Sequence, residues 1–351
     1  MSYIDKIFSN RKKILVTGGA GFIGSALIRK LLKYSSLIIL NIDKLSYASD
    51  LFSINKLLDD KNIAKRYKFL KIDLYNFKEI RKALFDFEPD LVFHLAAESH
   101  VDKSILDPSI FIKSNIVGTF NLLQSSLEFY ETLSDIKKKF FRFHHISTDE
   151  VFGSIEDDKL FHEKSSYDPR SPYSASKASS DHLVRAWSHT YDLPVILTNC
   201  SNNFGPWQFP EKLIPKAITN ALRGTKIPLY GDGLNVRDWL YVDDHVEALL
   251  LSANKGTIGE SYCIGNNNEK TNKEVLFEIC NILDELKPAK GSYFNLIKEV
   301  KDRPGHDRRY AINPQKIQNQ LNWIPKYNFR HGLEKTIKWY IDNHSWWESK
   351  K

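Results

Sequence analysis

The chain has 351 residues, of which 42% are hydrophobic and 26% charged, and this balance excludes an intrinsically disordered protein. The length predicts one large domain or two closely joined ones. A formal net charge of +7 is compatible with nucleic acid, an acidic membrane surface or anionic small molecules as partners. The positive charge is scattered, and its one dense run, 137–139, precedes an apolar stretch. We interpret this run as a solvated loop and expect no nucleic-acid partner.

The three cysteines, Cys200, Cys263 and Cys280, lie far apart and have no histidine partner at the spacing of a metal site. They argue against a disulfide framework and against a bound metal, and they fit a reducing compartment. The first 19 residues lack the apolar core of a signal peptide. No later run approaches the roughly 18 apolar residues of a membrane span. We therefore expect a cytoplasmic protein that does not contact a membrane.

Short apolar runs alternate with amphipathic helical patterns through the first 200 residues. Each run is almost continuously apolar, as in strands that are covered on both faces. Alternation of this kind predicts right-handed βαβ units and a doubly wound parallel sheet of the α/β class. The predicted strands cover 12–17, 37–43, 67–73, 90–96, 140–147 and 193–199.

The pattern changes after about residue 200, where prolines and glycines divide the chain into loops and short helices. The earlier rhythm returns briefly at 243–255 and 260–266, and amphipathic helices are predicted at 272–286 and 332–344. We predict a larger domain over 1–200, to which the chain returns around 236–265. A smaller α/β C-terminal region over 201–351 would close over the sheet.

Gly18, Gly21 and Gly24 lie at the turn from the first predicted strand into the first predicted helix. Gly18 permits a tight turn, Gly21 lets the backbone approach a pyrophosphate, and Gly24 allows the helix to pack closely on the strand. The helix N-terminus adds free N–H groups and the positive end of the helix dipole. Glycine spacing alone is weak evidence for a dinucleotide site. Here the three glycines follow a predicted strand, open a predicted helix and precede an acidic residue at the end of the next strand. The larger domain is therefore predicted to be a Rossmann-type dinucleotide-binding domain.

Asp43 ends the second predicted strand and is expected to accept hydrogen bonds from the adenosine ribose hydroxyls. Its charge would repel a 2′-phosphate and favour NAD over NADP, although Lys44 beside it weakens that preference. A loop-capping role is the alternative for Asp43. Asp73, at the end of the third predicted strand, is interpreted either as a contact to the adenine amino group or as a cap.

Tyr173 and Lys177 are four residues apart in a predicted helix and lie on one face of it. A free tyrosine has a pKa of about 10, too high for a base near neutral pH. A nearby ammonium and a positively charged nicotinamide would lower that pKa. The same spacing occurs in many helices. In a chain that also has a predicted dinucleotide-binding turn, it indicates a pair of catalytic residues.

Several motifs then give the chain a resemblance to a known superfamily. The segments TGGAGFIG (17–24), STDEVFG (147–153) and SPYSASK (171–177) resemble the extended short-chain dehydrogenase/reductases, which act largely on nucleotide sugars. Within that nucleotide-sugar branch the chain is most similar to the 4,6-dehydratases that act on dTDP-glucose. The motifs that carry this closer similarity are HLAAESHVDKSI (94–105), NCSNNFGPWQFPEKLIP (199–215), GDGLNVRDWLYVDDH (231–245) and DRPGHDRRYAI (302–312).

The resemblance implies a hydro-lyase that oxidises the sugar at C4, eliminates water across C5–C6 and reduces C6, with NAD regenerated in each turn. Tyr173 would take the C4 hydroxyl proton, with Thr148 sharing that hydrogen bond and Lys177 tuning it. Glu150 would be the base at C5, and Asp149 the acid for the C6 hydroxyl. Two neighbouring carboxyl groups can hold different protonation states if their surroundings differ.

A geometric condition applies to this pair of carboxyl groups. Adjacent strand residues point to opposite faces, so Asp149 and Glu150 reach one substrate only if the strand ends or bends there. If the strand continued, one of them would face away as a cap or an ion-pair partner. His144 and His145, further back in the strand, are interpreted as packed or hydrogen-bonded.

The resemblance also assigns binding residues by motif position, with the larger domain binding NAD and the smaller region binding a nucleotide sugar. Planar guanidinium groups at Arg237 and Arg303 would bind the substrate diphosphate. Ser114 stands where the family has threonine, and Ser49 with Asp50 where it has Gly-Asn. The implied cofactor-binding residues are Gly18, Gly21, Phe22, Ile23, Gly24, Asp43, Lys44, Leu45, Ser46, Asp73, Leu74, Leu95, Ala96, Ala97, Ser99, Ser114, Tyr173, Lys177 and Asn203. The implied substrate-binding residues are Ser99, His100, Thr148, Asn202, Lys212, Leu213, Pro228, Tyr230, Arg237, Asn272, Arg303 and His306.

The resemblance further implies a homodimer that forms through long helices at 104–130 and 172–191, and a product that feeds deoxysugar and cell-surface polysaccharide synthesis. The alternatives are a 4,6-dehydratase of a CDP- or UDP-sugar and a nucleotide-sugar 4-epimerase, which needs only the hydroxyl residue with Tyr and Lys. A non-catalytic NAD-binding scaffold that binds RNA is a further alternative. The retention of Tyr173, Lys177 and both carboxyl groups argues against that scaffold.

Overall fold

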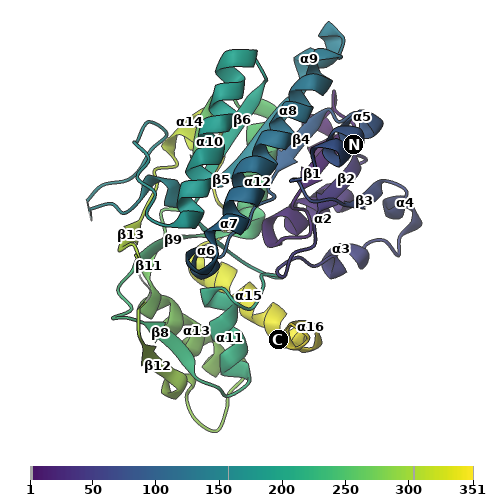
Figure 1. Ribbon diagram of the computed structural model, residues 1–351. Coiled ribbons are helices and arrows are strands. Elements are labelled where there is room, and N and C mark those ends of the chain that lie inside the picture. The colour runs from purple at the N-terminus through teal and green to yellow at the C-terminus, as the bar shows by residue number, and fades with distance from the viewer. Residues whose placement is uncertain (1–2, 157, 303–304, 351) are drawn as a thin grey trace.

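The computed structural model describes residues 3–156, 158–302 and 305–350. Its centre is a seven-stranded parallel sheet with the strand order β10-β6-β5-β4-β1-β2-β3 (Figure 1). This order places β1 and β4 at the middle of the sheet, where two βαβ halves meet, so the predicted Rossmann-type doubly wound fold is confirmed. The strands are β1 (Lys13–Thr17), β2 (Ile38–Asp43), β3 (Tyr67–Lys71), β4 (Leu91–His94), β5 (Arg142–Thr148), β6 (Val195–Cys200) and β10 (Ser261–Ile264).

Helices cover both faces of this sheet because alternate strand residues point to opposite sides. In β1, Ile14 and Val16 pack against one helical layer, and Leu15 packs against the other. The first layer contains α2 (Phe22–Tyr34), α12 (Val242–Lys255) and α14 (Gln315–Leu321). The second contains α5 (Phe77–Phe87), α8 (Gly118–Glu131) and α10 (Pro172–Tyr191), of which α8 and α10 cross the front of the sheet in Figure 1.

A smaller region, in the lower part of Figure 1, has its own apolar core. There β9 (Val236–Tyr241) pairs with β7 (Asn202–Phe204), β11 (Glu269–Thr271) and β13 (Arg309–Tyr310), and β8 (Ile227–Tyr230) pairs with β12 (Ile297–Val300). Its helices are α11 (Leu213–Leu222), α13 (Asn272–Leu286), η3 (Tyr293–Leu296), α15 (Phe329–Asp342) and α16 (His344–Glu348).

Three details differ from the sequence-based expectations. The chain rejoins the large domain with α12, β10 and α14, because β9 belongs to the smaller sheet. The long helix predicted over 104–130 is divided into α6 (Val101–Leu106), α7 (Pro108–Phe111), a π-helical turn η1 (Ile112–Val117) and α8, since Pro108 cannot continue a helix. The lysine run lies in a short helix, α9 (Asp135–Phe140), and not in a loop.

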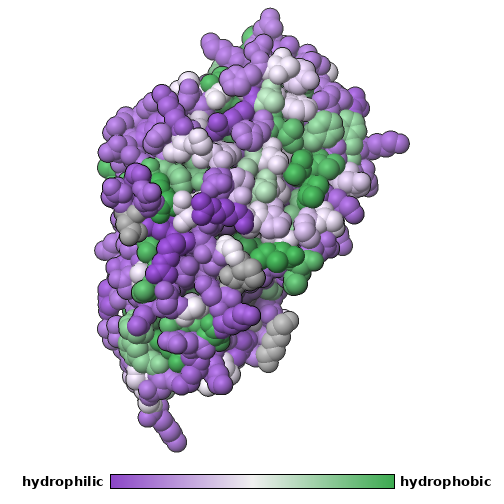
Figure 2. Space-filling view, turned by 60° about the vertical axis from the view of Figure 1, so that its left-hand side comes forward, coloured by the Kyte–Doolittle hydropathy of each residue, from purple (hydrophilic) through white to green (hydrophobic). Residues whose placement is uncertain are grey.

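The remaining short elements are α1 (Tyr3–Ile7), α3 (Phe52–Asn55), α4 (Lys61–Ala64) and the 3₁₀ turn η2 (Asp149–Phe152). Within the described ranges, no helix is long and apolar enough to cross a membrane, and no group of three or more His, Cys, Asp or Glu side chains could hold a metal ion. Figure 2 shows a mainly hydrophilic surface with a hydrophobic area on the right side of the face in view. Large exposed apolar side chains occur on α6, α7, η1 and α8, among them Ile105, Leu106, Ile110, Ile112 and Phe120.

Candidate active site

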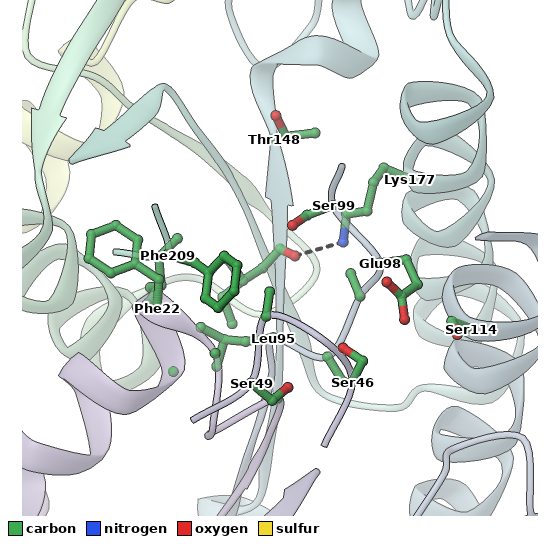
Figure 3. Close-up of a pocket in the computed structure, with 18 of the residues that line it drawn as sticks. Phe22, Ser46, Ser49, Leu95, Glu98, Ser99, Ser114, Thr148, Lys177 and Phe209 are labelled. Atoms are coloured by element: carbon green, nitrogen blue, oxygen red, sulfur yellow. Dashed lines mark hydrogen bonds between the residues drawn. The ribbon is translucent and has the colours of Figure 1, made fainter. Parts of the chain in front are cut away.

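A cleft lies at the carboxyl ends of the parallel strands, where ligands of open α/β sheets bind. Each of six strands delivers lining residues to it at or directly after its last residue. Figure 3 shows side chains from these loops and from the adjoining helices around the cleft. The strand ends supply Gly18 after β1, Asp43 at the end of β2, Asp73 after β3, Leu95 after β4, Thr148 at the end of β5 and Ser201 after β6.

The glycines of the β1–α2 turn are required by space and by backbone conformation. Gly18 has φ +70°, and a Cβ there would lie 2.6 Å from the backbone nitrogen of Ala96. A Cβ on Gly24 would lie 2.2 Å from the carbonyl oxygen of Gly18, so only glycine lets α2 pack this closely. Helix α2 starts after Gly21 without a side-chain cap, which leaves its first N–H groups available to a diphosphate. The turn therefore fits the pyrophosphate of a dinucleotide.

Asp43 lines the cleft and also holds the loops around it. Its carboxylate accepts hydrogen bonds from the backbone N–H groups of Ala20 (3.0 Å) and Leu45 (2.8 Å) and from the hydroxyl of Ser49 (3.1 Å). Burial raises the pKa of Asp43, and these hydrogen bonds act against that rise. Asp43 therefore caps these loops, as its alternative role predicts, and it lies in the cleft where its predicted contact with the ribose hydroxyls would form. Ser49, which stands where the family has glycine, has a structural role as well, because its hydroxyl orients the Asp43 carboxylate.

Lys44 is neutralised by an acid that the sequence did not single out. Its ammonium lies 2.7 Å from Glu98 Oε1 and 2.7 Å from Ser114 Oγ, and all three residues line the cleft (Figure 3 labels Glu98 and Ser114). Glu98 is buried, and its backbone N–H donates to Asn115. The positive charge beside Asp43 is therefore balanced within the protein.

All but one of the residues predicted to bind the cofactor line this cleft. The exception is Leu45, which has φ +58° and donates its backbone N–H to Asp43. Asp73 lines the cleft and also accepts a hydrogen bond from the backbone N–H of Tyr75 (2.9 Å), so its capping alternative holds as well.

The acidic pair follows directly on the end of β5. The strand ends at Thr148, and residues 149–152 form the 3₁₀ turn η2. Thr148 caps this turn, since its hydroxyl accepts the backbone N–H of Glu150 at 3.3 Å. Asp149 and Glu150 both line the cleft, so the condition that the strand should end here is met.

The surroundings of the two carboxyl groups differ. Asp149 is 2% exposed, and burial, together with the charges of Glu150 and Asp238, raises its pKa well above the usual carboxyl value. Its Oδ2 atom is buried without a hydrogen-bond partner among the described residues, as is Oδ1 of Asn202. Glu150 is only partly buried. Of the two carboxyl groups, Asp149 is therefore the one that holds a proton more tightly.

Tyr173 and Lys177 lie on one face of α10, buried beneath the same cleft. Lys177 Nζ donates to the carbonyl oxygen of Ile146 at 2.9 Å (Figure 3). Burial and the charge of Glu150 raise the pKa of Tyr173 well above its usual value, and a hydrogen bond with Thr148 acts in the opposite direction. Within the protein, burial and Glu150 thus act against the lowered pKa that the sequence predicts for Tyr173 beside Lys177 and a positively charged nicotinamide.

A second cleft continues from the first into the smaller region, and Ser99, Glu150, Asn202 and Lys212 line both. All described residues predicted to bind the substrate line this second cleft, except Thr148, which lines the first. Arg303 lies outside the described residues. Those lining the second cleft are Ser99, His100, Asn202, Lys212, Leu213, Pro228, Tyr230, Arg237, Asn272 and His306.

The side chain of Arg237, which lines the second cleft, is held in place by neighbouring protein groups. Its guanidinium donates to the carbonyl oxygens of Val236 (2.7 Å) and Asp307 (2.9 Å) and lies 4.2 Å from the ring centre of Tyr310. These contacts fix the planar guanidinium in one orientation at the wall of the second cleft.

Several residues that line the clefts were not predicted from the sequence. They lie outside or between the motif positions to which the family resemblance assigns a function. Glu211 connects the two clefts: it accepts the Tyr47 hydroxyl at 2.9 Å, and it lies 3.5 Å from the His100 imidazole. The sequence feature that could have identified Glu211 is its position beside Lys212 in a motif of the family. The other missed residues of the first cleft include Tyr47, Ala48, Ser49, Ile72, Glu98, Cys200, Gln208 and Phe209.

Comparisons with known proteins agree with this geometry. The chain matches the family model described as GDP-mannose 4,6 dehydratase over residues 15–336. It is 51% identical over 343 residues to the dTDP-glucose 4,6-dehydratase of Neisseria meningitidis serogroup B, and the match covers 96% of each chain.

Two solved structures are similar over almost the whole chain. The dTDP-glucose 4,6-dehydratase of Bacillus anthracis in complex with NAD has a TM-score of 0.84 and 42% identity, and covers 97% of this chain and 100% of its own. DesIV, a dTDP-glucose 4,6-dehydratase of Streptomyces venezuelae solved with NAD bound, has a TM-score of 0.88 and 40% identity at the same coverage. With this identity over nearly its full length, the chain belongs to the dTDP-glucose 4,6-dehydratase family, in the nucleotide-sugar branch of the extended short-chain dehydrogenase/reductases.

Proposed function

We propose that the protein is a NAD-dependent hydro-lyase that converts dTDP-glucose into dTDP-4-keto-6-deoxyglucose, a precursor for deoxysugar biosynthesis. The observation that carries the proposal is the arrangement of Asp149 and Glu150 on one turn, in the cleft that also holds Tyr173 and Lys177. Full-length identity of 51% to a dTDP-glucose 4,6-dehydratase supports the substrate.

NAD fits the first cleft, because the turn at Gly18, Gly21 and Gly24 suits its pyrophosphate and Asp43 suits its adenosine ribose. When bound, NAD supplies a hydride acceptor for C4 and a hydride donor for C6. The balanced charge of Lys44 supports NAD over NADP, because its ammonium is already paired with Glu98 and attracts a 2′-phosphate less strongly.

Tyr173 accepts the proton of the C4 hydroxyl during oxidation, and Thr148 orients it through their shared hydrogen bond. The form of Tyr173 that can accept this proton is the phenolate, and the transfer leaves the neutral phenol. Lys177 would stabilise the phenolate, since its ammonium is buried one helical turn away. Burial and Glu150 raise the pKa of Tyr173, so the positive charges of Lys177 and of the nicotinamide ring of NAD would have to favour the phenolate against them.

Elimination uses the two carboxyl groups in opposite protonation states. Glu150 removes the C5 proton, which the C4 ketone makes acidic, and Asp149 donates its proton to the departing C6 hydroxyl. The raised pKa of Asp149 supports this division, because it favours the protonated form that can donate. Each proton transfer contributes about 10²- to 10⁴-fold to the rate.

The nucleotide diphosphate is bound in the second cleft by Arg237 and the residues around it. In this proposal residues 1–200 together with β10 bind NAD, and the region after residue 200 binds most of the sugar nucleotide. We also propose a homodimer, supported by the exposed apolar side chains on α6 to α8, and a cytoplasmic location, supported by three buried free cysteines.

A single incubation tests the proposed reaction. Purified protein with NAD and dTDP-glucose is expected to yield a keto sugar nucleotide lighter by one water, without net accumulation of NADH. Steady NADH formation would indicate an ordinary dehydrogenase, and a product of unchanged mass a 4-epimerase. Parallel incubations with CDP-glucose and UDP-glucose measure nucleotide preference, and equal rates on all three would contradict the dTDP assignment.

A further inference from the structure

A fully buried carboxylate lies behind the reactive pair of α10. Asp181 is four residues after Lys177 and eight after Tyr173, so all three share one face of the helix. Asp181 has 0% exposure and lines neither cleft. It therefore cannot touch a ligand in those clefts, and any effect on the reaction must pass through its neighbours.

Four donors converge on the carboxylate of Asp181 from elements that are far apart in the sequence. The donors from β5 are His145 Nε2 at 3.1 Å and Ser147 Oγ at 2.9 Å. Tyr167 donates its hydroxyl at 2.9 Å from the loop before α10, and Asn199 Nδ2 lies at 3.2 Å on β6. Hydrogen bonds to an ionised acceptor are roughly twice as strong as neutral ones, so this carboxylate joins α10, β5 and β6.

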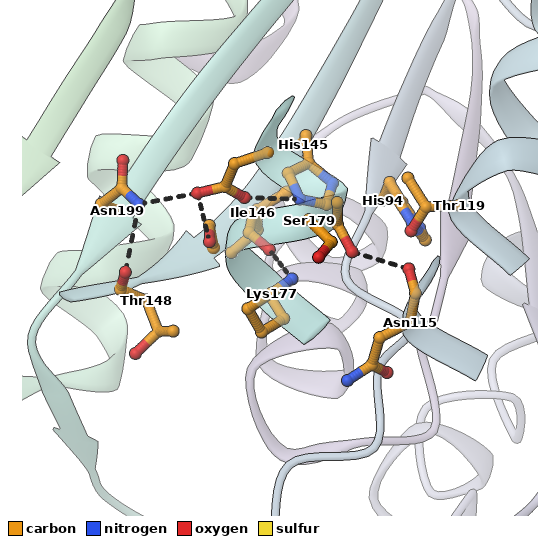
Figure 4. A network of polar contacts seen from close by, with 12 residues as sticks. His94, Asn115, Thr119, His145, Ile146, Thr148, Lys177, Ser179 and Asn199 are labelled. Atoms are coloured by element: carbon orange, nitrogen blue, oxygen red, sulfur yellow. Dashed lines mark hydrogen bonds and ion pairs between the residues drawn. The ribbon is translucent and has the colours of Figure 1, made fainter. Parts of the chain in front are cut away.

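The network leads directly to the catalytic turn. Asn199 Nδ2 also donates to the carbonyl oxygen of Thr148 at 3.1 Å, and Ser147 is the residue before Thr148 (Figure 4). Thr148 in turn caps the 3₁₀ turn that carries Asp149 and Glu150. Asp181 thus holds the last two residues of β5, at the point where the strand must end for both acids to face the cleft.

The same carboxylate faces a buried ammonium. Burial lowers the pKa of Lys177, and the charge of Asp181 acts against that loss. Burial would raise the pKa of Asp181, but hydrogen bonding to His145 and the charges around it hold the pKa below its usual value. His145 is neutral, with a pKa lowered to about 4 by burial, so the positive charge facing Asp181 is that of Lys177. Removing the charge of Asp181 would therefore make the buried ammonium of Lys177 less favourable.

We propose that Asp181 is a positioning residue for the dehydratase reaction: it fixes the end of β5 beneath Thr148 and supplies the counter-charge of Lys177. The proposal rests on the proposed function, because it assigns Asp181 to the oxidation and elimination steps of that reaction. A purely structural role would lower the amount of folded protein and leave the rate of each folded, NAD-loaded site unchanged.

The main test is Asp181→Asn, which keeps the size of the side chain and removes its charge. We expect kcat per NAD-loaded site to fall roughly 10- to 100-fold, with KM for dTDP-glucose within about twofold of wild type, because small misplacements of reacting groups cost rates of this order. The rapid formation of NADH in a single turnover should slow as well, since Tyr173 and Lys177 act in that step. Ser179→Ala is the matched control, because Ser179 is partly buried on the same helix and its hydroxyl donates to the carbonyl oxygen of Ala175, one turn earlier in that helix.

Two further variants remove single donors and keep the carboxylate. Tyr167→Phe and Asn199→Ala should each lower kcat several-fold with KM unchanged, and Asn199→Ala should have the larger effect because Asn199 also holds Thr148. If Asp181→Asn does not fold, these two variants decide the question. Wild-type kcat per loaded site in a folded Asp181→Asn protein, or in both donor variants, overturns the proposal. If the wild-type protein itself does not dehydrate dTDP-glucose, the proposed function fails instead.

Discussion

Asp149 and Glu150 are consecutive in the chain and line the same cleft, because β5 ends at Thr148 and a 3₁₀ turn begins at Asp149. In a continuing strand the two carboxyl groups would lie on opposite faces of the sheet. Their proximity also supports the proposed division of roles, since the charge of Glu150 adds to burial in raising the pKa of Asp149. One turn of backbone thereby carries both the proposed acid and the proposed base.

Replacing Glu150 with Gln should abolish the base and leave the redox pair intact. We expect the exchange of the C5 proton with solvent deuterium and the overall kcat to fall about 10²- to 10⁴-fold. C4 oxidation should remain measurable, and NADH should accumulate in a single turnover. Glu156→Gln, at an exposed glutamate beyond the same turn, is the control. Normal dehydration by Glu150→Gln would show that another group removes the C5 proton.

Asp149→Asn should lower activity and raise stability. A carboxyl group whose pKa is raised by folding binds its proton more tightly in the folded state, so stability falls as pH rises from the ordinary carboxyl value through the raised one. Asparagine does not titrate. The variant should therefore melt roughly 2–4 °C higher than wild type above the raised pKa, a change of about 1 kcal/mol. The difference should vanish below about pH 4, the ordinary pKa of aspartate.

Thermal melts of both proteins from pH 4 to pH 9 measure this effect, with the exposed Asp135→Asn as the control. A variant that is less stable than wild type at pH 8 would indicate that the ionised form of Asp149 is the one the fold prefers.

Glu98→Gln should weaken the discrimination between NAD and NADP. The substitution keeps the shape of the side chain but releases the Lys44 ammonium, which now lies 2.7 Å from Glu98 Oε1 in the cofactor cleft. An unpaired ammonium attracts a 2′-phosphate, so we expect the NADP affinity to rise about tenfold, or about 1.4 kcal/mol, relative to NAD. Cofactor titrations of the apoprotein by tryptophan fluorescence measure both constants. Adding Lys44→Met to Glu98→Gln should reverse the gain, and a gain that persists would exclude Lys44 as its cause.

Leu106→Glu should dissociate the proposed dimer. Leu106 is 84% exposed on α6 and lies among other exposed apolar side chains on α7 and η1. A buried carboxylate at a subunit interface is strongly unfavourable unless it is paired. Light scattering should give a monomer mass for Leu106→Glu and a dimer mass for Ile136→Glu, a control at a 76% exposed position on α9. A dimer mass for both variants would place the interface elsewhere.

Local sequence patterns predicted the regular elements and the glycine turn well. Helix α13 has the predicted bounds, 272–286, because its apolar periodicity is uninterrupted. The parallel sheet followed from the alternation of apolar runs with amphipathic segments. The helix predicted over 104–130 failed at Pro108, a residue whose effect on helices is local and was visible in the sequence.

The sequence by itself determined the Rossmann-type fold, the cofactor turn and the identity of the five catalytic candidates, because periodicity, glycine spacing and motif order are properties of short segments. Only the tertiary structure decided that β5 stops at Thr148, that Glu98 neutralises Lys44, and that Asp181 joins α10 to β5 and β6. It also revealed that burial and Glu150 act against the lowered Tyr173 pKa that the sequence predicts. These features depend on burial and on charges that are distant in the chain, and such interactions acquire their strength only when folding brings the groups together away from water.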